Sequence, residues 1–381
     1  MAKAVVLARL TVFDEDFKMY AGVEELIKNL NEDGHKIIVI SHGTESIRIM
    51  KKIFEETFEF KVICTYRKII RENVNEDNAS SFILVGSSDD DLILAANKRI
   101  LIINPAWSVK QEEKPARYGI SLERPDQLFE AIRLIDNQNK WYYELEIDQN
   151  TTVLALTSAN TLNGDVVRTE KEVLIGFENL LKSGNRNYFN TLYFHLISGV
   201  MKSSELRNVD RWGIFPSSSV NLNEELEELK ERCRYLTYKK MNKPLFIRHT
   251  AVNKSRNTDP EIRRRLGCMK HFDSIVLNPY YSNKIKGQVV CVIDDYITNG
   301  ISFETARNLL LKAGAKKIIL VALGRYRKGQ HGIYQHEVYD LKGNITKPGY
   351  NYTLNSRENL IGKYDNSARD EVRRIYDILN G

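Results

Sequence analysis

Two adjacent aspartates stand before a glycine-containing loop in the C-terminal half of the chain. Asp294 and Asp295 follow a strand that we expect over 288–293, and residues 298–302 then lead into a helix that we expect over 303–313. The backbone N–H groups of such a turn, together with a helix N-terminus, form a pocket for a phosphate dianion. The two carboxylates can accept hydrogen bonds from neighbouring sugar hydroxyls. The combination predicts a site for a sugar phosphate.

The loop itself supplies further groups to this site. Thr298 and Ser302 add hydroxyl donors, and Gly300 lets the backbone approach a ligand closely. A short motif of this kind can also be a plain strand–turn–helix with a capping acid. The strand before it and the helix after it favour the binding site. The candidate residues are Asp294, Asp295, Tyr296, Ile297, Thr298, Asn299, Gly300, Ile301 and Ser302.

This segment resembles the phosphoribosyl pyrophosphate-binding motif of type I phosphoribosyltransferases, in which the acids are followed by Thr-Thr-Gly-x-Thr. Asn299 replaces the second Thr and Ser302 the last one, and both changes keep a small polar residue. The resemblance implies that Asp294 and Asp295 take part in catalysis by holding the ribose. It also implies a Mg²⁺ cofactor bound mainly through the oxygens of phosphoribosyl pyrophosphate, with no dedicated cluster of protein ligands.

A second loop precedes the acidic one in the chain. A strand expected over 212–215 ends in Pro216-Ser217-Ser218-Ser219, in the place where this family carries its pyrophosphate loop. Alone, the four residues would be only a surface turn. Their order before the acidic loop favours a role in binding the departing diphosphate through backbone N–H groups.

A basic segment between the two loops resembles the ComF-type branch of the family. That branch has the pattern Arg-x-Thr-x-x-Gln, then an Arg and a closing aromatic residue. The resemblance implies a mobile hood over the site, with Arg256 as a further catalytic residue, and cations suit a diphosphate leaving group. A solvated basic helix is the alternative. The matching positions are Arg256, Thr258, Glu261 in place of Gln, Arg264 or Arg265, and Phe272, and the family resemblance covers about 171–323.

Strand and helix signals alternate through the first third of the chain, which predicts a parallel sheet covered on both faces. The expected strands are 4–10, 36–40, 61–64, 81–85 and 100–103, and the expected helices are 23–30, 44–57, 89–98 and 125–135.

A second α/β unit follows. Its expected strands are 141–147, 151–156, 212–215, 288–293 and 317–323, and its expected helices are 171–182, 187–201, 223–238, 303–313 and a final one near 368–379. At 381 residues the chain is too long for one typical domain. We therefore expect an α/β protein of two domains, 1–148 and 149–381.

The first unit resembles the haloacid dehalogenase (HAD) superfamily, a Rossmann-like parallel fold, over about 4–135. The similarity lies in segments 21–26, 34–41 and 83–91. It implies that Ser41 is the phosphate-binding hydroxyl and that Arg67 or Lys68 is the cation of the third motif. In the fourth motif Asp91 is kept, while Ser87 stands where the first Asp belongs.

The nucleophile motif of that superfamily is missing from this sequence. Alignment places Ala8, Leu10 and Val12 at its positions, and none of them is an acid. Without a nucleophilic carboxylate there can be no aspartyl-phosphate intermediate. We expect a structural or ligand-sensing domain without activity. The alternative, a phosphatase that uses Asp14 and Asp16, leaves too few residues for the usual flap before the next helix.

Composition limits the partners and the location. The net charge of +6 is small, and 56 Lys and Arg are scattered among 50 acids, which argues against a nucleic-acid partner. No apolar run reaches the roughly 18 residues that span a bilayer, and the start lacks the features of a signal peptide. The four cysteines form no CxxC pair, as in a reduced protein. We expect a cytoplasmic protein without a membrane partner, and self-association stays open.

The leading hypothesis is an enzyme that transfers ribose 5-phosphate from phosphoribosyl pyrophosphate to a nucleobase or base-like acceptor. A second hypothesis is a non-catalytic sensor of that metabolite, or a ComF-like accessory protein. A third is a bifunctional enzyme that also dephosphorylates its product. No motif identifies the acceptor.

Overall fold

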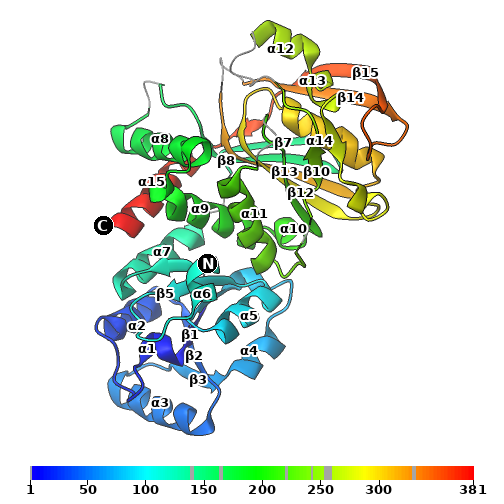
Figure 1. Cartoon of the computed structure of the whole chain (residues 1–381). Helices are drawn as coiled ribbons and strands as arrows, with labels where there is room; N and C mark the ends of the chain where they lie inside the picture. The colour runs from blue at the N-terminus through cyan, green and yellow to red at the C-terminus, as the bar shows by residue number, and fades with distance from the viewer. Residues whose placement is uncertain are drawn as a thin grey trace.

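The computed structural model describes residues 2–137, 141–162, 166–218, 222–241, 243–252, 260–327 and 332–381. Its elements fall into two α/β halves, each built around one six-stranded sheet (Figure 1). The expected α/β class with two separate sheets is confirmed. Across these described ranges, no helix is both long and apolar enough to cross a bilayer.

The sheet of the first half is wholly parallel, with the strand order β3-β2-β1-β4-β5-β6. From β1 the chain adds β2 and β3 on one side, and then returns to add β4, β5 and β6 on the other side. The carboxyl ends of β1 and β4 therefore lie side by side at the point where the order changes direction. Its elements are β1 Ala4–Ala8, α1 Arg9–Val12, α2 Val23–Glu32, β2 Lys36–Ser41, α3 Thr44–Thr57, β3 Ile63–Tyr66, α4 Arg67–Asn73, η1 Ala79–Ser81, β4 Phe82–Val85, α5 Asp89–Lys98, β5 Leu101–Pro105, α6 Glu113–Tyr118, β6 Ile120–Leu122 and α7 Pro125–Asn137.

The strands of this sheet are short apolar runs because both of its faces are covered. The first strand ends earlier than the expected residue 10. Arg9–Val12 instead forms one helical turn, which buries Val12 and lets the Thr11 hydroxyl donate to the carbonyl of Val85 at 3.0 Å.

The sheet of the second half is mixed, with the order β16-β7-β8-β13-β12-β9. Its four strands β8, β13, β12 and β9 are parallel, and β7 and β16 are antiparallel additions. The elements are β7 Tyr143–Asp148, β8 Thr151–Ser158, α8 Arg168–Ser183, η2 Arg186–Tyr188, α9 Phe189–Lys202, α10 Ser204–Arg207, β9 Arg211–Ile214, α11 Glu224–Leu236, β10 Phe246–Arg248, α12 Pro260–Leu266, α13 Met269–Phe272, β11 Ile275–Leu277, η4 Pro279–Tyr281, β12 Val289–Ile297, α14 Ile301–Lys312, β13 Lys317–Arg325, β14 Tyr334–Lys342, β15 Asn351–Leu360, β16 Lys363–Tyr364 and α15 Ser367–Asn380.

The change from one sheet to the other falls before β7. That strand forms a hairpin with β8, with Tyr143 opposite Ala155 and Leu145 opposite Val153. A boundary at residue 148 would therefore cut this hairpin between its two strands. Both strands of this hairpin belong to the second sheet.

The two aspartates of the acidic motif lie in a strand rather than in the expected loop. β12 continues through Ile297, with Asp294 opposite Ala322 and Ile297 opposite Arg325 in β13. Helix α14 begins at Ile301, two residues before the expected start. The loop is shorter than expected because pairing with β13 holds the acidic residues in extended backbone.

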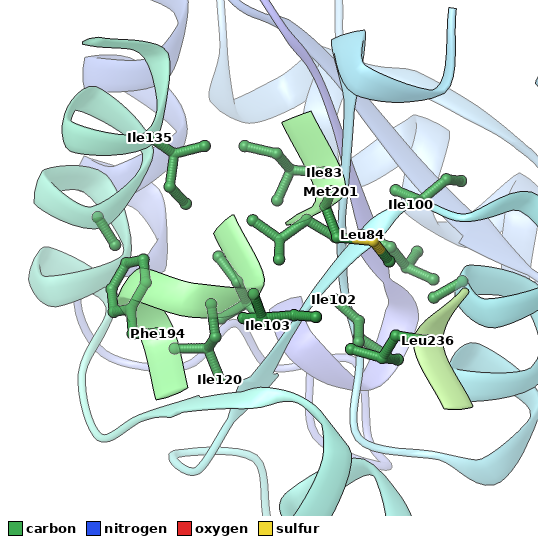
Figure 2. Packing of buried hydrophobic residues seen from close by; sticks show 14 of the residues in the cluster. Ile83, Leu84, Ile100, Ile102, Ile103, Ile120, Ile135, Phe194, Met201 and Leu236 are labelled. Atoms are coloured by element: carbon green, nitrogen blue, oxygen red, sulfur yellow. The ribbon is translucent and has the colours of Figure 1, made fainter. Parts of the chain in front are cut away.

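The two halves share one hydrophobic core. Helices α9 and α11 of the second half pack against strands and helices of the first. Figure 2 shows apolar side chains from both halves meeting in one cluster. The labelled members from the second half are Phe194, Met201 and Leu236, and those from the first are Ile83, Leu84, Ile100, Ile102, Ile103, Ile120 and Ile135.

The C-terminal helix joins the halves a second time. α15 packs on α7 of the first half and on α8 and α9 of the second. The Gln127 side chain of α7 donates to the carbonyl of Ile378 at 2.9 Å, and Arg369 pairs with Glu170 of α8 at 2.6 Å. The amphipathic helix expected near 368–379 is thus a bridge between the two units. All four cysteines are buried and unpaired.

Candidate functional site

Two of the loops expected to bind the ligand leave the second sheet at the same edge. β9 and β12 are parallel neighbours, with Ile214 opposite Ile293, so the segments that follow them emerge together. Pro216, Ser217 and Ser218 follow β9, and Thr298, Asn299 and Gly300 follow β12. We call this the carboxyl edge, because the carboxyl ends of β8 and β13 also lie there. In open α/β sheets ligands bind at such an edge.

The carbonyl groups of the loop after β12 are held from inside the protein. The backbone N–H of Tyr326 donates to the carbonyl of Ile297 at 2.9 Å. The guanidinium of Arg325 donates to the carbonyl of Thr298 at 2.5 Å. The backbone N–H of Gln335 donates to the carbonyl of Asn299 at 2.9 Å. Three successive carbonyls therefore point toward β13 and β14.

The N–H groups of the same loop must point the other way. In a planar trans peptide the C=O and the following N–H are directed oppositely, so the N–H groups of Thr298, Asn299 and Gly300 are directed away from β13 and β14. Among the described residues, none accepts a hydrogen bond from these three groups. With the first turn of α14 they form a set of neighbouring donors that suits an anion.

Gly300 allows this arrangement for two separate reasons. Its φ of 87° lies in the left-handed region that other residues avoid. A Cβ atom at this position would also overlap the ring of Tyr334. The Tyr334 hydroxyl donates to Glu304 of α14 at 2.9 Å, so the ring that packs on Gly300 is itself fixed. A larger residue at position 300 would displace the loop.

The two aspartates have different neighbours. Burial, followed by the adjacent Asp295 carboxylate, raises the pKa of Asp294 well above its usual value. Asp295 instead forms an ion pair with Lys182 of α8, whose ammonium lies 5.4 Å from the centre of the Tyr296 ring. The edge thus holds one carboxylate that resists ionisation and one that is already neutralised by a lysine.

Arg248 holds carbonyl groups of the loop after β9, just as Arg325 holds a carbonyl group of the loop after β12. Its guanidinium donates to the carbonyl of Ser217, to the carbonyl of Pro216 at 3.2 Å and to the hydroxyl of Ser274 at 2.6 Å. Burial lowers the pKa of Arg248 to about 10, and the Asp294 carboxylate acts in the opposite direction. This arginine therefore connects the second loop electrostatically to the acidic pair.

The expected hood is described only in part. Arg256 and Thr258 of the hood, like Ser219 of the loop after β9, lie outside the described residues. Arg264 and Arg265 lie in the short helix α12 with exposed side chains. The carbonyl of Arg264 accepts from the Gln335 side chain at 2.8 Å, and Gln335 is the residue whose backbone N–H binds Asn299. Helix α12 is thus connected to the loop through its backbone.

Sequence reasoning missed three cations at this edge, and one of them had a recognisable signal. Arg325 directly follows the apolar run 318–324 of a parallel strand, whereas Arg248 ends β10, which pairs antiparallel with β11 in a separate sheet. A charged residue at the carboxyl end of a buried parallel strand is a candidate for the edge of the sheet. Lys182 had no such signal, because it meets Asp295 only through the packing of α8.

The first half brings together two of the residues expected at its own edge, Arg67 and Asp91. Arg67 pairs with Asp91 and contacts His42, which follows Ser41 at the end of β2. Asp91 also accepts from the Ser88 hydroxyl at 2.6 Å. A pocket of about 210 Å³ adjoins this cluster, lined by Ser41, His42, Tyr66, Arg67, Lys68 and Ile69. Of the two cations considered, Lys68 is exposed and pairs with Glu72.

The positions of the missing nucleophile motif contain no acid. Ala8 ends β1, and Val12 is fully buried. The carboxylate of Asp14 accepts from the backbone N–H of Asp16 at 3.0 Å and of Lys18 at 2.8 Å, which is a local turn on the surface. Asp14 therefore stabilises the turn between Phe13 and Met19.

At the carboxyl edge, Asp294 and Asp295 are described residues whose carboxylates could contact a metal ion. Two neighbouring carboxylates are present, and within the described ranges no group of three or more His, Cys, Asp or Glu is arranged to hold a metal ion.

Comparison of the chain with protein-family models, with curated proteins and with solved structures finds no significant match.

Proposed function

We propose that the second half binds phosphoribosyl pyrophosphate at the carboxyl edge and transfers its ribose 5-phosphate to a nitrogen of a base-like acceptor. The observation that carries this proposal is the direction of three successive N–H groups away from β13 and β14. They belong to Thr298, Asn299 and Gly300, which follow the aspartate pair. Oriented N–H groups suit a phosphate, and carboxylates suit vicinal hydroxyls, so the two groups together favour a phosphorylated sugar.

The reaction breaks one bond and forms another at the anomeric carbon. The bond to the diphosphate oxygen is broken, a bond to the acceptor nitrogen is formed, and the acceptor loses a proton. Because the transition state has oxocarbenium character, it needs positioning and stabilisation of the leaving group more than a strong base. The backbone of the loop 216–218, which Arg248 holds through the carbonyls of Pro216 and Ser217, would bind the departing diphosphate.

Mg²⁺ bound by the ligand's own oxygens would neutralise part of the diphosphate charge. Asp294 and Asp295 are the residues of this chain that fit such an ion or the water around it. Ionised Asp294 would accept hydrogen bonds from the ribose, and Lys182 would have to give up part of its contact with Asp295.

A second function, a sensor without turnover, needs the same pocket. Two features favour the sensor: the hydrophobic core that both halves share and the cluster around Arg67. Both fit a first half with a structural or ligand-sensing role. Buried arginines hold both loops, the one after β9 and the one after β12. This favours the enzyme hypothesis, because a sensor needs only the loop after β12.

Calorimetric titration of phosphoribosyl pyrophosphate with Mg²⁺ into the full chain tests the proposal. We expect the wild type to bind and an Asp294→Ala/Asp295→Ala variant to lose binding, since each charged hydrogen bond contributes about 1.5–3 kcal/mol. Release of diphosphate with any of a panel of bases then separates the enzyme from the sensor. Absence of binding by the wild type would refute both functions.

A further inference from the structure

Two buried arginines lie behind the two loops of the carboxyl edge. Arg325 is 0% exposed and Arg248 is 7% exposed. Besides the carbonyl of Thr298, Arg325 donates to the carbonyl of Gly332 at 2.6 Å and to the hydroxyl of Tyr364 at 3.2 Å. Its guanidinium also lies 4.6 Å from the centre of the Tyr143 ring.

The partners of both guanidinium groups are neutral. They are backbone carbonyls, hydroxyl groups and rings, and within the described ranges no carboxylate lies within ion-pair distance of Arg248 or Arg325. Burial of a charge without an ion-pair partner costs free energy even when its hydrogen bonds are satisfied, and at Arg248 the Asp294 carboxylate offsets only part of that cost. A negative charge placed at the loops would lower that cost.

Both arginines also determine the direction of the loops' N–H groups. Arg325 holds the carbonyl of Thr298, and Arg248 holds the carbonyls of Pro216 and Ser217. Since each peptide is planar, each carbonyl held inward turns the next N–H outward. The same contact therefore provides a positive charge and orients a donor.

We propose that Arg248 and Arg325 are positioning residues for one polyanionic ligand that spans the loops 216–218 and 298–300. They hold the carbonyls of Ser217 and Thr298, which turns the next N–H groups, those of Ser218 and Asn299, toward that ligand. The negative charge of the ligand offsets the positive charges of the two arginines. The inference rests on the proposed function for the identity of the ligand, a sugar phosphate that carries a diphosphate. It does not rest on that function for the class of ligand, a polyphosphate anion.

The test compares Arg325→Met and Arg248→Met with a matched control, Arg207→Met. Arg207 is also buried and also donates to backbone carbonyls, those of Met201 at 2.6 Å and Lys202 at 3.2 Å. It lies in α10, before β9, and so at the opposite end of the strands. Calorimetry with inorganic diphosphate, inorganic phosphate and phosphoribosyl pyrophosphate gives the affinities.

We expect each Met variant at the edge to bind diphosphate about 10- to 100-fold more weakly, and Arg207→Met to bind as the wild type does. The preference for diphosphate over phosphate should shrink as well, because the more highly charged ion loses more. Arg325→Lys should recover part of the affinity, and millimolar methylguanidinium should recover part of it in Arg325→Met. A variant that is merely misfolded would not recover affinity when methylguanidinium is added.

Equal affinities in the wild type and the edge variants would overturn the inference. An equal loss for both ions, without rescue, would overturn it too, because it would mean that the arginines only hold the loops in shape. Diphosphate binding that depends on the arginines, without binding of phosphoribosyl pyrophosphate, would refute the proposed function and keep the inference. Binding of neither by the wild type would refute both.

Discussion

Lys182 and Asp295 form an ion pair across the acidic end of β12, although they belong to different layers of the second half. The lysine comes from α8, and its ammonium also faces the ring of Tyr296. Its positive charge opposes the rise in the pKa of Asp294 that burial and Asp295 cause. The residue thus favours the ionised form of the carboxylate beside its partner.

Replacement of Lys182 by Gln should therefore shift the pH dependence of ligand binding. Binding that needs ionised Asp294 strengthens as the pH rises through the pKa of that group. Loss of the lysine charge raises this pKa further, so the rising limb moves to higher pH. Titrations of phosphoribosyl pyrophosphate at several pH values would measure it, with Lys171→Gln on the same helix as the control. A limb that moves to lower pH would contradict the prediction.

Gly300→Ala should destabilise the protein more than Gly349→Ala does. Both glycines have nearly the same φ, 87° and 88°, but only at Gly300 would a Cβ meet the ring of Tyr334. We expect about 1–2 kcal/mol for Gly349→Ala, from the left-handed backbone alone, and about 2–4 kcal/mol for Gly300→Ala. Urea unfolding measures both, and equal costs would mean that the ring moves aside freely.

Asp91→Ala should destabilise the first half through Arg67. The two side chains are 3% and 9% exposed, so the substitution leaves a nearly buried guanidinium whose remaining acidic neighbour, Asp90, is 3.6 Å away. We expect a loss of about 2–4 kcal/mol. A second substitution, Arg67→Met, should restore part of it.

A matched surface pair provides the comparison for that prediction. Asp126 and Arg124 are both largely exposed, so Asp126→Ala should cost less than about 1 kcal/mol. Similar costs for the two alanine variants in urea unfolding would show that the Arg67 pair contributes no more than a surface contact.

Stability should fall as the medium becomes acidic, partly because of His195. Burial lowers the pKa of this histidine to about 4, and its ring contacts the carbonyl of Leu156 at 3.2 Å. The unfolded chain takes up a proton near pH 6.5, while the folded protein does so only near pH 4. Between these values each pH unit costs about 1.4 kcal/mol per such group.

His195→Gln should reduce this acid sensitivity, since glutamine has no proton to gain in this range. Unfolding free energies of the two proteins between pH 7.5 and about 4.5 would show curves that converge toward low pH. Parallel curves would mean that other groups cause the whole effect.

Most elements of the two sheets could be predicted because parallel strands buried on both faces appear as plain apolar runs, such as 37–40 and 318–323. The end of β12 could not be predicted in this way. Asp294 and Asp295 look like loop residues in the sequence, and only the pairing of Ile297 with Arg325 extends the strand past them. Strand ends depend on neighbours that the local sequence does not reveal.

The candidate site also has one part that the sequence predicts and one part that it does not. The motif around Gly300 could be identified because one glycine and two acids at fixed spacing are recognisable in a sequence. The contacts that orient its N–H groups come from Arg325 and Gln335, which follow the loop by a whole helix and strand. Their role depends on which atoms meet in space, and no spacing rule contains that information.

The shared core means that neither half of this protein can be deleted without exposing apolar side chains of the other. Phe194, Met201 and Leu236 are buried partly by Ile102 and its neighbours in the first sheet. A chain cut down to its second half would expose these side chains to water, so the halves should melt in one transition. Natural selection on the second half alone would then preserve the first as a folding partner, whether or not any chemistry remains in it.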